Sequence, residues 1–576
     1  MQISTIQNNA IESRRIYAEN SRILNENLYK YKNNNELIDD SVKEELLNSA
    51  REMASSSLDR PLSCEICELL QKRALQTNDR LLFFQSTCGI VDSLFNMDIN
   101  LFNGRMHDEL SKILEYRNIF FDLSLEEKKI FHESLSLYFI NIKNKNRGEN
   151  YREILETFEE IIKFWTNPRV QEATPSLELP SFVNKLRWDL LELIGDMRHF
   201  NKMPKDVSLA VYDAGNALYE ALGEELLSHF AHLQFFYHAA KFHLGKEDAT
   251  DLLDRIESLV EPLPDDPYGG ESLYRVFIIG SFYANYVKYD DTEKRRFVVK
   301  KINERMIKYI VSVPNSCRLK DVNISMKHAI YYLLPFLNEE ESIKLIQIFI
   351  LYRHLPTYVH SKMVNRISQV ILKKSLDMNL DLFKGYENNI VSDETREKKL
   401  SFLVERSCLI HDIGKISCLE TVSRTGRKLT DREYEIIKSH PLKGVSIIDN
   451  TNINNVYVEV TKYHHTWYAN TGGYPYCDEY LPINDVIDLI AIADSIDAAT
   501  DCYGRTYSKE KSLKEVVEEL KAGAGTRYSG QFVDLLNERD VLADLEYIIS
   551  DGRSFELVGA FIVKEMISNG QMKDLF

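Results

Sequence analysis

The sequence predicts an all-α protein. Many segments place apolar residues three and four positions apart, as in residues 146–165 and 248–263, which is the spacing of an amphipathic helix. Alternating Val, Ile and Thr runs are scarce, and the chain of 576 residues holds only 23 Gly and 14 Pro, which favours helix over strand. Because this length exceeds that of a usual domain, we expect several folded units.

Residues 1–345 are predicted to form consecutive amphipathic helices. Breaks rich in proline and turn formers fall at residues 167–180 and 261–272, which suggests stacked helical hairpins. Degenerate tetratricopeptide-like repeats are one interpretation, but the absence of a clean 34-residue period leaves an irregular helical domain as the alternative. Since no glycine-rich nucleotide loop is present, we expect a regulatory or protein-interaction region and not a second enzyme.

Two clusters in this region are weak signals. Cys64 and Cys67 have no second pair at zinc spacing, so a metal or redox role is not expected. Residues 226–245 contain four histidines, of which only His229 and His232 are helical neighbours. Histidines among Phe and Tyr on a helix are expected to be core or boundary residues.

Charge and hydropathy exclude several classes of protein. The net charge of −17 argues against binding of DNA or RNA polymers, which requires a basic face. The most apolar stretch, residues 276–287, is shorter than the roughly 18 residues of a membrane span. The first residues lack the apolar core of a signal peptide, and eight scattered cysteines suggest free thiols. We therefore expect a cytoplasmic protein without a membrane span.

Histidines with polar or turn neighbours characterise the C-terminal part of the sequence. Within residues 402–419, an apolar helical run ends in His411 and Asp412, which are followed by Gly414 and Lys415. Imidazole beside carboxylate offers a nitrogen ligand and a bridging oxygen ligand for a divalent metal. Gly414 is expected to let the backbone turn, and Lys415 to extend towards an anion held by the metals.

A further helix is predicted to begin at Asp431, because Thr430 and Glu433 form a capping box. His440 lies at its far end, before Pro441 disturbs the helix. The alternative for His440 is a histidine that caps a helix C-terminus. The buried side of this helix is expected to consist of Tyr434, Ile436 and Ile437.

Two adjacent histidines, His464 and His465, open a glycine-rich turn that closes on Gly473 and Tyr474. Adjacent residues cannot share a helix face. Both imidazoles can therefore meet at one point only if the backbone bends around it.

The apolar helix predicted over residues 483–501 carries Asp494 and Asp497 on one face. Buried carboxylates need partners, because an unpaired buried charge is very costly. A metal-bound Asp494 supported by Asp497 would satisfy both groups. The alternative is a capping or salt-bridge role, which suits Asp497 better than Asp494.

In this order, these blocks resemble the HD-GYP family of bacterial cyclic-di-GMP phosphodiesterases over about residues 350–540. The matching blocks are HDIGK (411–415), KLTDREYEIIKSHP (428–441), HH followed by GGYP (464–475) and IADSIDAAT (491–500). The segment 358–368 is similar to the opening helix of the family and makes His360 the first ligand. The resemblance implies metal-dependent hydrolysis of cyclic-di-GMP to linear pGpG.

The resemblance also implies a centre of two divalent metal ions, Fe or Mn, between which the ligand types do not discriminate. The ligands implied for one ion are His360, His411 and Asp494, and those for the other are His440, His464 and His465. Asp412 would bridge the two ions and, with Lys415, act in catalysis. The implied substrate-binding residues are Lys415, Gly473, Tyr474 and Arg505.

Departures from the family pattern affect the metal count and the substrate. Trinuclear members have a Glu where this chain has Pro356, which favours two ions. Thr466 stands where the family usually has Glu, and Ala469-Asn470 and residues 528–530 replace other family motifs. The alternatives are therefore a related phosphohydrolase for another cyclic dinucleotide or a nucleotide, or a catalytically weak binding module.

The predicted organisation is a helical region (1–345), a phosphohydrolase domain (346–545) and a C-terminal helical extension (546–576). The glycine-containing residues 522–530 are expected to form the turn into the last helix of the phosphohydrolase domain. A protein partner bound through the helical region, and a homodimer, are both compatible with this organisation.

Overall fold

The chain is helical throughout the part that the structure describes. The computed structural model describes residues 31–32, 38–54, 60–146, 148–195, 203–228, 231–260, 280–312, 327, 330, 333–389, 394–422, 429–449, 451–476, 484–501 and 510–569. Among these residues there is no strand, only two isolated bridges, which confirms the all-α prediction. The chain divides near residue 300 into two compact units.

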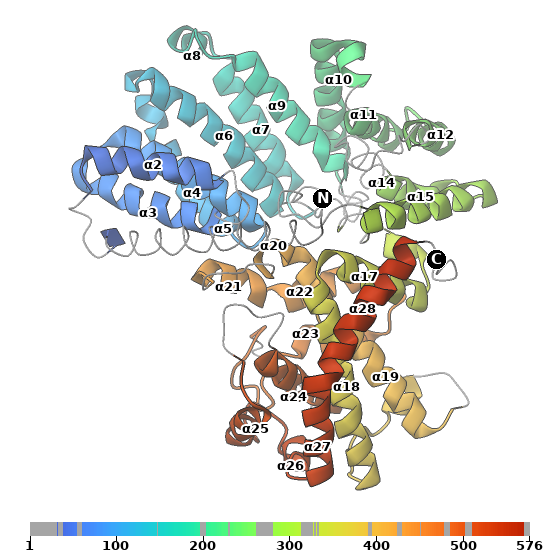
Figure 1. Cartoon of the computed structure of the whole chain (residues 1–576). Helices are drawn as coiled ribbons and strands as arrows, with labels where there is room; N and C mark the ends of the chain where they lie inside the picture. The colour runs from blue at the N-terminus through green and yellow to red at the C-terminus, as the bar shows by residue number, and fades with distance from the viewer. Residues whose placement is uncertain are drawn as a thin grey trace, which may run out of the picture. The chain divides into compact units, whose positions relative to one another are not determined.

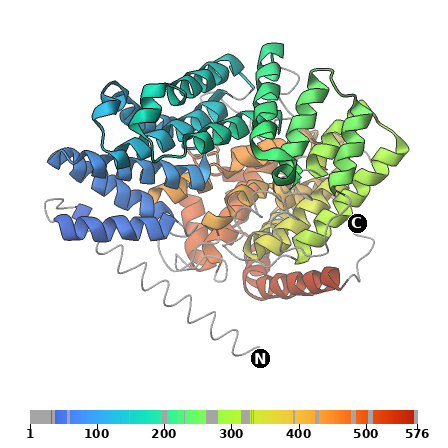
Figure 2. The same ribbon diagram turned by 90° about the horizontal axis from the view of Figure 1, so that it is seen from above.

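In the N-terminal unit, consecutive helices lie beside one another in chain order (Figures 1 and 2). They are α2 (Asp40–Ala54), α3 (Arg60–Thr77), α4 (Arg80–Asp98), α5 (Asn103–Leu114), α6 (Leu125–Asn146), α7 (Tyr151–Trp165), α8 (Pro168–Ala173), α9 (Leu179–Leu191), α10 (Lys205–Ser228), α11 (Ala231–His243), α12 (Ala249–Val260) and α14 (Gly280–Tyr286), with α15 (Glu293–Ser312) crossing the division. Consecutive helices are thus confirmed, whereas repeats stay a prediction.

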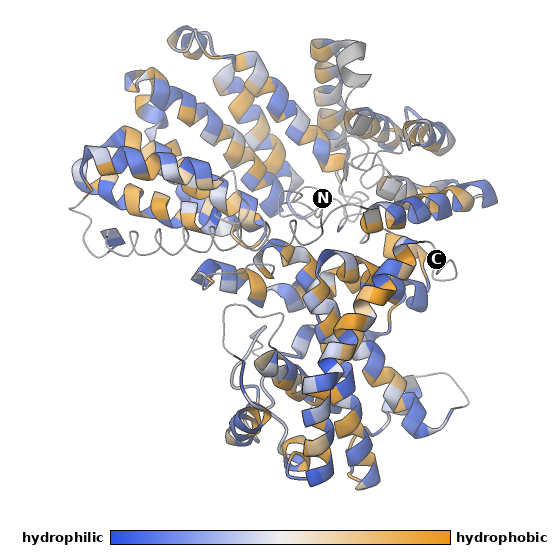
Figure 3. Ribbon diagram, in the orientation of Figure 1, coloured by the Kyte–Doolittle hydropathy of each residue, from blue (hydrophilic) through white to orange (hydrophobic). Residues whose placement is uncertain are grey.

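Local sequence explains these helices. Asn150 caps the start of α7 through its side chain, and hydrophobic and hydrophilic residues alternate around most helices (Figure 3), so each helix has an apolar face to bury. The predicted break at 167–180 holds the short helix α8. The other predicted break, residues 261–272, lies outside the described residues, as do the side chains of His229 and His232.

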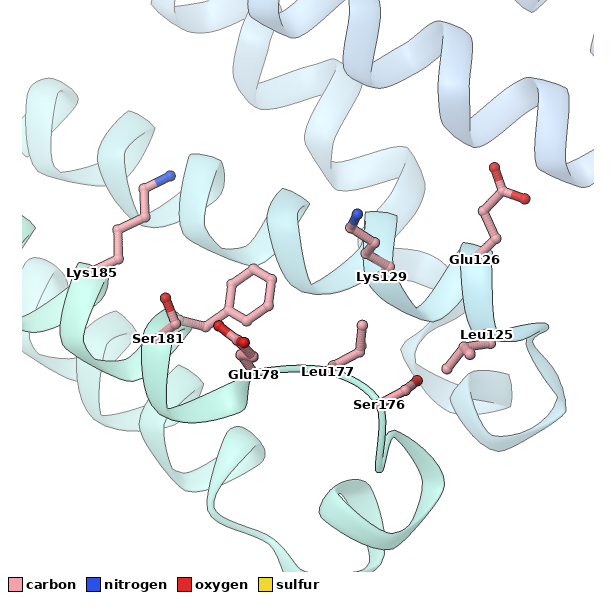
Figure 4. Close-up of a pocket in the computed structure, with 9 residues that line it drawn as sticks. Leu125, Glu126, Lys129, Ser176, Leu177, Glu178, Ser181 and Lys185 are labelled. Atoms are coloured by element: carbon pink, nitrogen blue, oxygen red, sulfur yellow. The ribbon is translucent and has the colours of Figure 1, made fainter.

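A cavity of about 800 Å³ opens in this unit beside the first turns of α6 and α9 (Figure 4). Its apolar wall includes Leu125, Leu177 and Phe182, and Lys129 and Lys185 also line it. All of its lining residues fall between positions 125 and 185. The residues predicted for catalysis and metal binding all belong to the other unit.

The C-terminal unit is organised around the long helix α18 (Leu355–Asp377). The other elements are α17 (Glu339–Arg353), α19 (Arg396–Ile410), η10 (Ile413–Cys418), α20 (Leu419–Val422), α21 (Asp431–Lys438), α22 (His440–Ile448), α23 (Asn455–Tyr463), α24 (Asp485–Thr500), α25 (Leu513–Ala522), α26 (Gly530–Leu535), α27 (Arg539–Tyr547), η11 (Ile548–Gly552) and α28 (Arg553–Ser568). Helix α18 packs against α17, α19, α24 and α28 (Figure 1). None of the described helices of the chain is long and apolar enough to cross a membrane.

Several local predictions can be compared with this unit. The capping box of Thr430 and Glu433 is confirmed, and α21 begins at Asp431. The helix ends at Lys438, however, and His440 is the first residue of the next helix, where Pro441 is tolerated because the first turn needs no backbone donor.

Two further expectations were wrong. Tyr434 is 52% exposed, because the short helix α21 turns Glu433 and Ile436 inwards instead. Residues 522–530 do not lead into a last helix, since α27 and α28 follow α26. The predicted domain limits at residues 345 and 545 stay predictions; α17 runs through position 345, and α28 packs along α18.

Candidate metal centre

The structure brings all of the predicted ligands together in the C-terminal unit. His360 comes from α18, His411 and Asp412 follow α19, His440 opens α22, His464 and His465 follow α23, and Asp494 belongs to α24. Most of these side chains are at least nine-tenths buried, and His465 is the most exposed, at 23%. Ligands scattered over more than 130 positions therefore meet in one protected place.

Close backbone approach between η10 and α22 brings His440 beside Asp412. A Cβ atom on Gly414 would lie 1.8 Å from the carbonyl oxygen of His440 and 2.7 Å from the backbone nitrogen of Gly444. No real Cβ fits at such distances. Gly414 was expected to allow a turn, but its main role is to let these two backbones touch.

Three histidines share one arrangement of their ring nitrogens. The Nδ1 atoms of His411, His440 and His464 lie 2.7, 2.7 and 3.0 Å from backbone carbonyl oxygens of their own helical turns. A carbonyl oxygen can only accept, so each Nδ1 carries the proton and donates it. In the neutral imidazole, each Nε2 then keeps its lone pair, which is the tautomer that binds a metal through Nε2.

His360 is held by a carboxylate instead. Its Nδ1 lies 2.6 Å from Oδ2 of Asp497, and its Nε2 lies 3.0 Å from Oδ1 of Asp494 and 3.3 Å from Oδ2 of Asp412. Asp497 was predicted to support Asp494. In the structure it supports His360, and through this hydrogen bond directs Nε2 towards the two other carboxylates.

The converging atoms are mutually repulsive without a cation between them. Nε2 of His440 lies 3.2 Å from Nε2 of His464 and 3.1 Å from Oδ1 of Asp412, and with both Nδ1 atoms protonated all three atoms are acceptors. Nε2 of His411 has no hydrogen-bond partner although it is buried. Nitrogen and carboxylate donors of this kind fit a borderline divalent cation, so the residues present fit a metal centre.

Proximity separates the ligand atoms into two groups that could each hold an ion. One group is His360, His411 and Asp412, and the other is His440, His464 and His465; within each group the ligand atoms lie within 4.8 Å of one another. Asp494 joins the first group through its contact with His360. The assignment of these ligands to two separate ions stays a prediction.

Burial keeps His464 and His465 neutral, whereas neighbouring groups keep Asp412 charged. Burial lowers the pKa of His465 to about 3 and the pKa of His464 well below its usual value, so both lone pairs are available at neutral pH. Burial acts to raise the pKa of Asp412, but Lys415 and His411 hold that pKa well below the ordinary value. Neutral imidazole and ionised carboxylate are the forms that bind metals.

The glycine-rich loop is folded tightly against this centre. The backbone N–H of Tyr474 donates to the carbonyl of His465 at 3.2 Å, and the two rings lie 4.5 Å apart between centroids. Gly473 has φ +89°, and a Cβ there would lie 2.2 Å from the same carbonyl oxygen. The loop therefore requires glycine at 473 and places Tyr474 as a wall beside His465.

The predicted anion-binding residues are only partly described. Lys415 donates to Oδ2 of Asp412, so its ammonium group lies at the centre of the site. Arg505 lies outside the described residues. Nothing in the sequence pattern marked Arg553 of α28, which is 2% exposed and pairs with Asp497 at 2.9 Å.

Comparison with known proteins identifies a family domain in the same part of the chain. The HD domain family model matches residues 357–499. Similar proteins include a cyclic di-GMP phosphodiesterase of Thermotoga maritima (33% identity over 22% of this chain and 34% of that protein) and one of Pseudomonas aeruginosa (29% identity, 19% and 27%). A third is the 3'3'-cGAMP-specific phosphodiesterase 2 of Vibrio cholerae (28% identity, 24% and 26%).

Each match spans about a third or less of the relative's length. The matched segment nevertheless contains the His-Asp pair, the adjacent histidines and the Gly-Tyr-Pro turn around which the centre is built. The chain therefore contains an HD domain at residues 357–499, and its similarity to cyclic di-GMP phosphodiesterases supports placing it with the HD-GYP family.

Proposed function

We propose that the C-terminal unit is a metal-dependent phosphodiesterase that hydrolyses cyclic-di-GMP, with linear pGpG as the product. The observation that supports this most is the set of buried Nε2 and carboxylate acceptors facing one another around Asp412. The names of the relatives support the substrate class. The N-terminal helices would then regulate this activity or bind a protein partner.

In this proposal the protein holds two divalent cations, Fe or Mn. His360, His411 and Asp494 would hold one ion, His440, His464 and His465 would hold the other, and Asp412 would be a ligand shared by both. When bound, such ions lower the pKa of water and polarise a phosphoryl oxygen.

The chain's own groups orient the reactants. The carbonyl-held imidazoles keep their Nε2 atoms fixed without reorganisation, so the geometry is set before substrate binds. Lys415, whose ammonium lies at Asp412, can turn to a phosphate oxygen, and Arg505 is proposed to neutralise a second one. Gly473 and Tyr474 shape the pocket for base or ribose.

A second cyclic dinucleotide is a specific alternative, because one relative is named for 3'3'-cGAMP. The test is turnover of cyclic-di-GMP and 3'3'-cGAMP by purified protein supplied with Mn²⁺ or Fe²⁺. We expect faster cleavage of cyclic-di-GMP and accumulation of pGpG. Faster cleavage of 3'3'-cGAMP would identify that compound as the substrate and would leave the proposed reaction unchanged. Tight binding of either compound without cleavage would identify a binding module.

The expected metal content is two ions per chain. A third ion would need an additional ligand one helical turn before His360, but Pro356 occupies that position in the first turn of α18 and offers no donor atom. Elemental analysis of anaerobically purified protein measures this directly. Three tightly held ions per chain would contradict the prediction.

A further inference from the structure

We propose that Arg553, on helix α28 and outside the matched HD domain, is a positioning residue of the metal centre. It would act through Asp497, which directs His360 towards the metals. This proposal rests on the proposed function only in assuming that His360 binds a metal. The new element of the proposal is that helix α28 helps to position a ligand of the metal centre.

Arg553 is placed at an unusual point of the backbone. It is the first residue of α28 and follows η11, a π-helical segment over Ile548–Gly552. Segments of this kind are frequent at functional sites. The side chain is 2% exposed, and burial of a guanidinium is costly unless its charge is paired.

The guanidinium spans the last turn of α24. Its Nη2 lies 2.9 Å from Oδ1 of Asp497 and donates to Oγ1 of Thr500 at 3.0 Å. Its Nη1 lies 3.3 Å from Oδ1 of Asp501. Oδ1 of Asp497 accepts no hydrogen bond, so Arg553 acts on this carboxylate as a buried neighbouring positive charge.

Asp497 therefore has an ion-pair partner on one side and a hydrogen-bond partner on the other. One oxygen faces Arg553 and the other accepts from Nδ1 of His360, and the carboxyl group is fully buried. Without Arg553, Asp497 would remain as a buried charge near Asp494 and would be free to rotate away from His360. The imidazole would then lose the partner that fixes its tautomer and ring orientation.

Other contacts anchor α28 independently of Arg553. The hydroxyl of Tyr352 donates to the carbonyl of Lys564 at 2.7 Å, and Glu556 pairs with Arg366 of α18. Substitution of Arg553 therefore leaves much of the attachment of α28 in place. Arg366 also provides a matched control, because its ion pair joins α18 to α28 but does not touch Asp497.

The test is a Mn²⁺ titration of metal-free full-length protein, comparing Arg553→Met, Arg553→Lys and Arg366→Met with the parent. We expect Arg553→Met to weaken Mn²⁺ binding about 10- to 100-fold, as loss of a group supporting a ligand does. Arg553→Lys should recover part of the affinity, and Arg366→Met should bind as the parent does. Nitrogen-15 NMR of the histidines should show a changed tautomer balance for His360 only in the Arg553 variants.

Parent-like Mn²⁺ affinity in folded Arg553→Met would overturn the proposal. If that variant does not fold, Mn²⁺ affinity is measured for Arg553→Lys and Asp497→Asn instead. Parent-like affinity in both of these variants would contradict the proposal. Since Mn²⁺ binding is measured without substrate, the outcome is independent of whether cyclic-di-GMP is the substrate.

Discussion

Asp412→Ala is expected to lose bound metal and phosphodiester hydrolysis together. The Asp412 oxygens lie 3.1 Å from Nε2 of His440 and 3.3 Å from Nε2 of His360, so this carboxylate connects the two ligand groups. The loss in metal affinity should exceed the roughly 10- to 100-fold caused by removal of a supporting group. Metal analysis, circular dichroism and turnover on one preparation measure the effect.

Lys415→Ala is the comparison for this experiment. Its ammonium contacts Asp412 but offers no lone pair to a cation, so the variant should keep its metals. Turnover should fall by about 10²–10³, as when one charge-stabilising donor is removed. Full metal content and full turnover in Asp412→Ala would show that the centre lies elsewhere.

Gly414→Ala is expected to destabilise the C-terminal unit by about 3 kcal/mol or more, at the upper end of overpacking effects. The added Cβ would lie 1.8 Å from the His440 carbonyl oxygen and 2.7 Å from the backbone nitrogen of Gly444. No flexible side chain can move aside, so η10 and α22 must separate. The midpoint of urea unfolding and the metal content should both fall.

Gly559→Ala is the matched control. Gly559 lies inside α28, and a Cβ there would meet nothing within 4 Å. Alanine inside a helix is better than glycine by about 0.5–1 kcal/mol, so this variant should be slightly more stable. An unfolding midpoint of Gly414→Ala equal to that of the parent would refute the close approach of η10 and α22.

Local patterns in the sequence predicted the fold class and much of the local structure. The start of α21 depends on Thr430 and Glu433. Because these residues are only three positions apart, a capping box of this kind can be recognised from the sequence alone. The adjacent histidines 464 and 465 likewise required a bent backbone, and the chain turns there. Their roles as ligands remain proposals.

What could not be predicted depends on contacts between distant segments. Arg553 and Asp497 are separated by 56 positions, and no spacing rule relates a helix of the predicted extension to a carboxylate in α24. Gly414 was interpreted as a turn residue, because the sequence does not show that the backbone of His440, in another helix, packs against it. Tyr434 was also predicted to be buried, but packing of α21 against the rest of the unit buries Glu433 and Ile436 instead.

The most direct measurement is turnover of cyclic-di-GMP as a function of bound metal. Metal-free protein would be reconstituted with increasing Mn²⁺ or Fe²⁺, and cleavage would be followed by separation of the products. The account predicts no cleavage without metal, activity that rises with occupancy to a maximum at two ions per chain, and pGpG as the product. Cleavage that persists in the metal-free protein, or intact substrate with fully loaded protein, would contradict it.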